Sequence, residues 1–90
     1  MKPRRVYIAS PYTIGDQAVN VRRQIDAAEA IVAAGHVPHV PLLSHFWHLI
    51  HPHDHHHWLT LDFEWLRVCD AVLRLPGESR GADLEVAEAE

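Results

Sequence analysis

The stretch AVLRLPGESRGADLEVAEAE, residues Ala71–Glu90, passes from a strand through a turn into a helix. Its apolar run Ala71–Leu75 is typical of a buried strand. The small polar turn Gly77–Gly81 follows, and two carboxylates come where a helix should begin, near Gly81 or Ala82. A helix start offers unpaired N–H groups and the positive end of the helix dipole, so it can hold an anion or keep a carboxylate ionised. The stretch therefore indicates both an α/β unit and a candidate site.

The rest of the chain alternates between strands and helices in the same way. Short β-favouring runs and helical spacing of apolar residues predict four further elements. They are a strand at Val6–Ala9, a helix at Asp16–Ala34 with Asp16 as N-cap and Gly35 as its stop, a strand at Val37–Leu43, and a helix at His57–Cys69. Pro38 and Pro41 favour a short or edge position for the second strand, because proline cannot donate to a ladder.

This alternation predicts βαβ units and a parallel sheet. We expect one α/β domain over residues 1–90, Rossmann-like or flavodoxin-like, in which helices flank a small sheet of strand order 2-1-3. The chain ends in mid-helix at Glu90, so a longer native protein or a partner subunit could complete the fold. Ligands of open α/β sheets sit beyond the carboxyl ends of the strands. The segments Ser10–Gly15, Ser44–His57 and Pro76–Gly81 should therefore share one rim.

Composition narrows the classes of function. Ninety residues suit a single core, and a formal net charge of −4 gives no basic footprint for a nucleic-acid polymer. Cys69 has no intrachain partner, which favours a reducing, cytoplasmic setting. The apolar run Val6–Ala9 is too short for a signal peptide or a membrane span. A sheet this small leaves apolar helix faces that a partner could cover, so we also expect a homo-oligomer.

Two carboxylates near the expected rim suggest the chemistry. Glu85 falls in the first turns of the last helix, where the dipole favours its charged form and lets it attack an anomeric carbon. Asp62 lies between Trp58 and Trp65, where desolvation would raise its pKa and let it hold a proton. One carboxyl that attacks and one that donates are what glycosyl transfer with retention requires, at a separation that we expect to be about 5 to 8 Å. The alternative is that Glu85 serves only the dipole and that Asp62 is a solvated surface residue.

The turn before the last helix suggests a second feature. Ser79 and Arg80 come just before the helix start, so a hydroxyl, a guanidinium and free backbone N–H groups could converge on a phosphate. The alternative is structural, with Ser79 as the helix cap and Arg80 extended into solvent.

Three segments together resemble the nucleoside 2-deoxyribosyltransferase superfamily, including the 2'-deoxynucleoside 5'-monophosphate N-glycosidases and small bacterial relatives. They are VYIASPY from Val6, LDFEWLRVCDAVLRL from Leu61, and ESRGADLEVAEA from Glu78. The resemblance covers nearly the whole chain and implies that Glu85 is the nucleophile, that Asp62 is its acidic partner and that Tyr7 orients the nucleophile. It also implies that Ser79, six positions before Glu85, contacts a 5'-phosphate.

The chain departs from the nucleotide-hydrolysing branch after the first strand. There, Ser10–Asp16 stands where that branch has a Gly-rich, Arg-containing loop. The chemistry is therefore better specified than the substrate. The base, the sugar, the need for a 5'-phosphate and the choice between hydrolysis and transfer stay open.

The segment SHFWHLIHPHDHHHW, Ser44–Trp58, holds seven of the nine histidines. His45, His48 and His51 recur every three residues, so on one helix they could bind a metal ion, although no cysteine joins them. The other interpretation is that this segment, with Trp47, roofs a pocket whose aromatic rings stack on a nucleobase. Plain core packing of the tryptophans is a third possibility.

These patterns lead to one interpretation with two alternatives. We expect an enzyme of nucleotide metabolism that cleaves or transfers at the N-glycosidic bond of a nucleoside or its 5'-monophosphate, without a cofactor or a metal. The expected catalytic residues are Glu85, Asp62 and Tyr7, and the expected substrate-binding residues are Ser79, Arg80, Gly81, Ser10, Tyr12, His45, Trp47 and Trp58. The alternatives are a non-catalytic module that binds a nucleotide or an ADP-ribose-like ligand, and a His-rich metal-binding protein.

Overall fold

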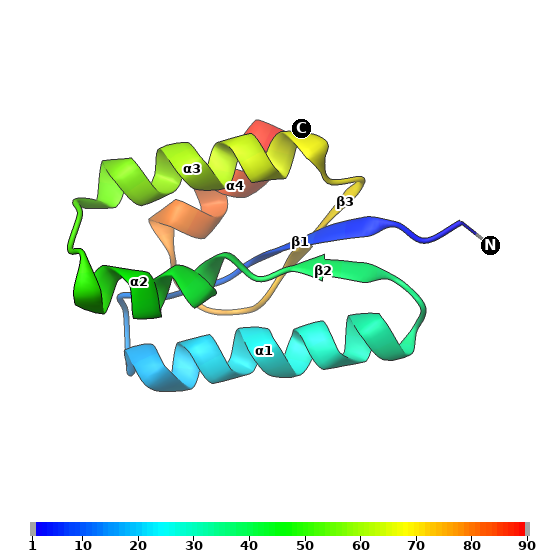
Figure 1. Cartoon of the computed structure of the whole chain (residues 1–90), viewed down its shortest axis with the longest axis horizontal. Coiled ribbons are helices and arrows are strands. Elements are labelled where there is room, and N and C mark those ends of the chain that lie inside the picture. Colours follow the sequence, from blue (N-terminus) through cyan, green and yellow to red (C-terminus); the bar gives the residue numbers. More distant parts are fainter. Residues whose placement is uncertain (1, 90) are drawn as a thin grey trace.

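The computed structural model describes residues 2–89 and has helices on both sides of a parallel sheet, as Figure 1 shows. The strands are β1 (Arg5–Ala9), β2 (Val37–His39) and β3 (Ala71–Arg74); the helices are α1 (Gln17–Ala33), the 3-10 turn η1 (Pro41–Leu43), α2 (Ser44–Ile50), α3 (His55–Val68) and α4 (Arg80–Ala89). The strand order is β2-β1-β3. The α/β class and the order 2-1-3 are thus confirmed.

The central strand β1 organises the sheet. It pairs in parallel with β2, placing Tyr7 opposite His39, and with β3, placing Ala9 opposite Arg74. Tyr7, Ile8 and Ala9 are fully buried, because α1 covers one face of the sheet while α3 and α4 cover the other (Figure 1). A strand buried on both faces reads as a continuous apolar run, which is what the sequence shows.

Both long helices begin at aspartates. The Asp16 carboxylate accepts the Val19 N–H at 3.1 Å, as expected for the N-cap of α1. In α3 the expected start at His57 was wrong by two residues, since the Asp54 carboxylate accepts the His57 N–H at 2.8 Å and the helix begins at His55. An Asp side chain satisfies one orphan donor of the first turn, so the cap fixes the helix start.

The second strand is shorter than expected. The sequence predicted strand over Val37–Leu43, but β2 ends at His39 and the chain turns into η1 and then α2. Pro41 starts η1, where its missing N–H costs nothing. Because β2 ends at His39, the segment Ser44–His57 lies at the rim of the sheet.

Gln24 of α1 joins three parts of the fold, although its side chain is fully buried. Its Nε2 donates to the Ile8 carbonyl at 3.0 Å and to Ser10 Oγ at 2.8 Å. Its Oε1 accepts the Leu42 N–H at 2.9 Å. The amide therefore satisfies the end of β1 and the start of η1 at once, in one fixed orientation.

We predict that Gln24→Leu lowers the free energy of unfolding by about 2 to 4 kcal/mol, because it leaves buried backbone groups of Ile8 and Leu42 unpaired. Urea denaturation measures this value. The matched control Gln17→Leu, at an exposed position of the same helix, should change it by less than about 0.5 kcal/mol. Equal stability of the two variants would contradict the role of Gln24.

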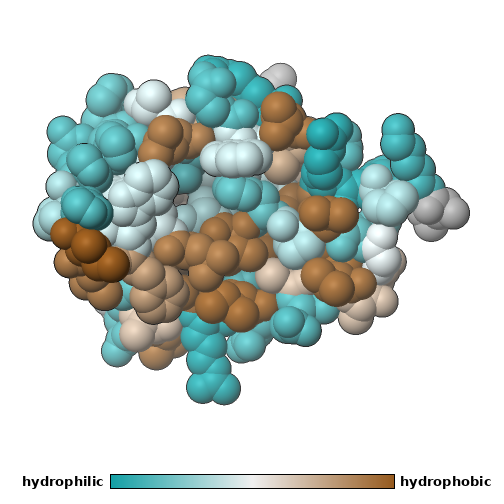
Figure 2. Space-filling model, in the orientation of Figure 1, coloured by the Kyte–Doolittle hydropathy of each residue, from teal (hydrophilic) through white to brown (hydrophobic). Residues whose placement is uncertain are grey.

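Exposed apolar side chains gather on one surface of the molecule. Phe46, Trp47, Leu49 and Ile50 of α2 are each more than half exposed, and Figure 2 shows apolar groups across the face that carries β2 and α2. Among residues 2–89, no helix is long and apolar enough to cross a membrane. The patch is consistent with a surface that another protein covers.

We predict that the protein self-associates through Leu49 and Ile50 at the C-terminal end of α2, so light scattering at micromolar concentration should give more than the monomer mass. Ile50→Glu should shift that mass toward the monomer, because it places a charge in the apolar contact. Val32→Glu, a change at an exposed apolar position of α1, is the control. A strictly monomeric wild-type protein would overturn this expectation.

Candidate functional site

A cavity of about 510 Å³ lies beyond the carboxyl ends of the strands, a volume within the range of small-molecule sites. Its lining combines residues from the three segments that the sequence placed on one rim. They are Ser10, Tyr12, Thr13 and Ile14 from the first, Ser44, His45, His48, His53 and His55 from the second, and Glu78, Ser79, Arg80 and Gly81 from the third. The shared rim is therefore observed.

Asp62 of α3 and Glu85 of α4 both line this cavity. The two carboxyl groups lie close enough to interact, since each acts on the pKa of the other. Two buried carboxyls that act on each other in this way share a proton, because two like charges side by side cannot both ionise easily.

Tyr7 holds Glu85 from inside the core. Its hydroxyl donates a hydrogen bond to Glu85 Oε2, and both side chains are buried. Burial, followed by the charge of Glu85, raises the pKa of Tyr7 far above its ordinary value, so the phenol stays protonated and can only donate. Tyr7 does not line the cavity and therefore acts through Glu85.

The two carboxyls differ in how firmly they hold a proton. Burial raises the pKa of Asp62 to about 8, and the charge of Glu85 adds to the rise. Burial also raises the pKa of Glu85, but hydrogen bonds from Tyr7 and Asp62 and the charge of Arg74 oppose that rise. Asp62 therefore holds a proton more firmly than Glu85, whose ionised form is favoured by the Tyr7 hydroxyl and by the charge of Arg74.

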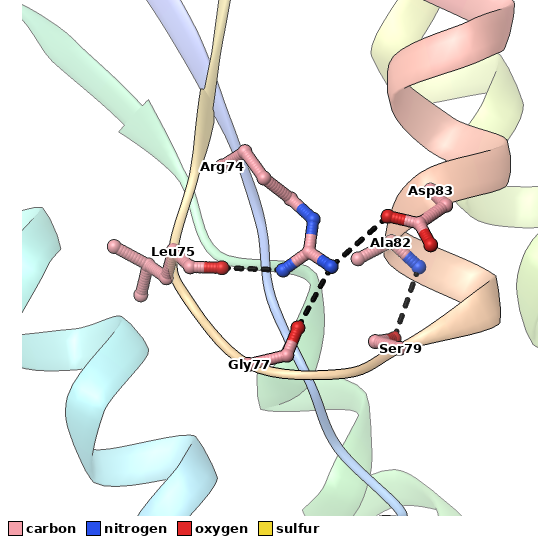
Figure 3. Close-up of polar contacts among 6 residues, drawn as sticks. All are labelled: Arg74, Leu75, Gly77, Ser79, Ala82 and Asp83. Atoms are coloured by element: carbon pink, nitrogen blue, oxygen red, sulfur yellow. Dashed lines mark hydrogen bonds and ion pairs between the residues drawn. The ribbon is translucent and has the colours of Figure 1, made fainter.

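The turn that leads into α4 is braced from within, as Figure 3 shows. The Arg74 guanidinium donates to the carbonyls of Leu75 and Gly77 and pairs with Asp83, at 2.9 Å to Gly77 and 3.0 Å to Asp83. Ser79 Oγ accepts the Ala82 N–H at 3.1 Å and so caps the helix, which begins at Arg80. The capping interpretation of Ser79 is confirmed.

Gly77 closes the turn against the loop after β1. Its φ is +121°, and a Cβ there would stand 2.7 Å from Pro11 Cγ, so a side chain has no room. The turn that carries Ser79 is thus packed on the loop that carries Ser10. This contact fixes the relative positions of the two hydroxyls.

The predicted substrate-binding residues divide between two places. Ser10, Tyr12, His45, Trp58, Ser79, Arg80 and Gly81 line the cavity. Trp47 does not line this cavity and instead lines a second one beside it. In α2, His45 and His48 are three residues apart and share a face, which turns Trp47 away from them.

Sequence reasoning missed Gln24 and Arg74. Gln24 lines the cavity and holds Ser10, while Arg74 holds the turn and lowers the proton affinity of Glu85. Both residues carried a signal: Gln24 sits on the apolar stripe of α1 between Val21 and Ala28, and Arg74 interrupts the apolar strand β3. A polar side chain at a core position usually has a specific partner.

The histidines of Ser44–Trp58 contact aromatic rings and backbone. His48 Nδ1 accepts the Trp58 indole N–H at 2.9 Å and the His53 N–H at 3.2 Å, and Tyr12 O–H contacts His45 Nδ1 at 2.5 Å. Over residues 2–89, no group of three or more His, Cys, Asp or Glu is arranged to hold a metal ion. The metal-binding alternative therefore gains no support from the geometry.

Comparison with known proteins identifies the family of the chain. The sequence profile of a family described as a domain of unknown function, DUF7768, matches residues 4–90. The chain belongs to this family. No curated protein and no solved structure matches it. The resemblance to nucleoside 2-deoxyribosyltransferases therefore stays a prediction based on the three sequence segments.

The raised pKa values predict that stability falls as pH rises. Between about pH 5 and 8 the folded protein retains a proton on the Asp62–Glu85 pair that the unfolded chain loses near pH 4, so the free energy of unfolding decreases across this window. Asp62→Asn removes one carboxyl from the pair. We expect it to raise the free energy of unfolding at pH 8.5 by about 1 to 3 kcal/mol relative to the wild type.

Urea denaturation at pH 4 and pH 8.5 measures this effect. At pH 4 the gain should be small, since both carboxyls are then largely protonated in the folded state. Glu29→Gln removes an exposed carboxylate from α1 and serves as the control for net charge. A gain for Asp62→Asn that is the same at both pH values would refute the shared proton.

Proposed function

We propose that this domain breaks the N-glycosidic bond of a nucleoside or of its 5'-monophosphate. The observation that carries the proposal is the pair of carboxyls, Asp62 and Glu85, which differ in proton affinity at the wall of a cavity of ligand size. Strongly shifted carboxyl pKa values inside a cleft are typical of catalytic acid and base pairs. The resemblance to nucleoside 2-deoxyribosyltransferases assigns the same two residues.

The reaction follows from where the proton resides. A Glu85 oxygen attacks C1' of the sugar while the C1'–N bond breaks and its electron pair passes to the base. Asp62 gives its proton to a nitrogen of the departing base. Water then attacks C1' and loses a proton to Asp62, which releases Glu85; a second base in place of water would give transfer. In this reaction the substrate lies between Asp62 and Glu85, and Tyr7 keeps Glu85 oriented.

Two hydroxyls favour a ligand that is rich in acceptor atoms. Ser10 Oγ accepts from Gln24, and Ser79 Oγ accepts from the Ala82 N–H, so each hydroxyl proton remains free to be donated. Arg80 and the N-terminus of α4 add positive charge beside them. This arrangement suits the phosphate of a 5'-monophosphate. Nucleotide metabolism would place the domain in the cytoplasm, where the lone Cys69 stays reduced.

The second candidate is a module that binds a nucleotide or an ADP-ribose-like ligand without cleaving it. The burial of Glu85 favours this candidate, because the side chain is only 6% exposed and its Oε2 already accepts a hydrogen bond from Tyr7. The two candidates differ in what the carboxylate of Glu85 must do. An enzyme requires its nucleophilic oxygen, whereas a binder requires only the shape and hydrogen bonds of the side chain.

We predict that Glu85→Gln lowers the rate of base release at least about a thousandfold, since an amide cannot act as the nucleophile. Chromatography of free base, after incubation with a panel of nucleosides and 5'-monophosphates, measures the rate. Glu29→Gln should keep the wild-type rate. If the wild type releases no base while both variants bind the same nucleotide with equal affinity, the domain is a binder.

The role of Ser79 can be separated from its capping role. Aspartate caps a helix about as well as serine but repels a phosphate, so Ser79→Asp should keep the stability of the protein. We expect it to weaken binding of a 5'-monophosphate by about 1 to 3 kcal/mol while leaving the unphosphorylated nucleoside nearly unaffected. Isothermal titration calorimetry with both ligands measures the difference. Equal losses would show that Ser79 serves the fold alone.

A further inference from the structure

A second cavity of about 420 Å³ lies beside the first, between β2, η1, α2 and α3. The linings of the two cavities overlap at four residues, which are Pro41, Ser44, Trp58 and Asp62. Glu85 belongs to the first cavity only, and Trp47 and Trp65 belong to the second only. Asp62 therefore lines both cavities, which we call the first and the second chamber, whereas Glu85 lines only the first.

The two chambers differ in chemistry. The first carries the serine hydroxyls, Arg80 and the N-terminus of α4. The second is lined mainly by apolar and aromatic side chains, among them three tryptophans, and Asp62 is its only acidic residue. Such a surface suits a flat, uncharged heterocycle that stacks on indole rings and accepts one hydrogen bond.

The tryptophans are arranged for contact with a ring. Trp65 stacks on His39 with ring centres 5.2 Å apart, and Trp47 meets Trp58 edge to face at 5.3 Å. Trp47 and Trp65 are nevertheless 53% and 56% exposed. Burial lowers the pKa of His39, so its ring is neutral and adds no charge to the chamber. Aromatic surface is thus available beside the acid Asp62 without a charged competitor.

We propose that the second chamber receives the nucleobase as it leaves, while the sugar stays bound to Glu85 in the first. This inference rests on the proposed function. Asp62 gives its proton to the base as the C1'–N bond breaks, and the neutral base moves onto Trp47 and Trp65. Its departure clears the side of C1' that faces Asp62, so a water molecule can reach C1' with Asp62 as its proton acceptor.

The test uses adenine as the base and 2-deoxyribose 5-phosphate as the sugar. In two-dimensional NMR the indole N–H signals of Trp47, Trp58 and Trp65, assigned by single Trp→Phe variants, report on each ring. Adenine should shift the Trp47 and Trp65 signals, and should still do so when the sugar phosphate is saturating. If the sugar phosphate displaces adenine, or if adenine leaves both signals unchanged, the two-chamber inference is wrong.

A matched pair of variants locates the effect. Trp47→Ala should weaken adenine binding about tenfold or more without changing the affinity for the sugar phosphate. Phe46→Ala removes an equally exposed aromatic ring that lines neither cavity, and should leave both affinities unchanged. Equal effects of the two variants on adenine would also overturn the inference.

These experiments distinguish a failure of the two-chamber inference from a failure of the proposed function. Suppose that the wild type releases base and that Glu85→Gln abolishes this release, while adenine leaves the Trp47 signal unchanged. In that case the proposed role of the second chamber is wrong and the proposed function stands. If adenine binds at Trp47 but no nucleoside or nucleotide is cleaved, both the function and the assignment of this chamber to a leaving base fail.

Discussion

The hydrogen bond from Tyr7 to Glu85 connects the central strand of the sheet to the last helix, and the arrangement of the site depends on it. A carboxylate with this little solvent contact is costly, and apolar residues of similar size would stabilise the same interior better. The cost is larger because Asp62 shares the site and its own pKa is raised by burial. Burying two carboxyls and a phenol that can only donate does little to stabilise the folded protein. They fit a site that must keep one proton available and one oxygen charged.

The surroundings of this trio are rigid at the points where a ligand would touch them. Gln24 fixes Ser10 through an amide that also satisfies the backbone of β1 and η1. Arg74 fixes the turn before α4, and Gly77 packs that turn onto Pro11. Hydroxyls held in this way do not have to be ordered when a ligand binds, which reduces the entropic cost of binding. The wall of the cavity is therefore held in place by contacts within the protein.

Much of the fold could be predicted because hydrophobic period and capping residues are local signals. The alternation of patterns led to the strand order, and Asp16 and Gly35 marked the ends of α1. The start of α3 was misplaced because a cap at Asp54 lies outside the apolar stripe. The site was harder to predict. Periodicity shows which face of an element is buried, but it does not show which polar side chain on that face finds a partner, so Gln24 and Arg74 were missed.

The two carboxylates at the start of α4 illustrate how the structure separates a structural from a functional role. Asp83 and Glu85 both lie near the positive end of the helix dipole, and the sequence alone gives each the same reason to be there. Asp83 is exposed and pairs with Arg74, so it serves the turn. Glu85 points into the interior, where Tyr7, Asp62 and the more distant charge of Arg74 act on it. One arginine therefore links the two: by bracing the turn through Asp83, it keeps its own charge where it favours the ionised form of Glu85.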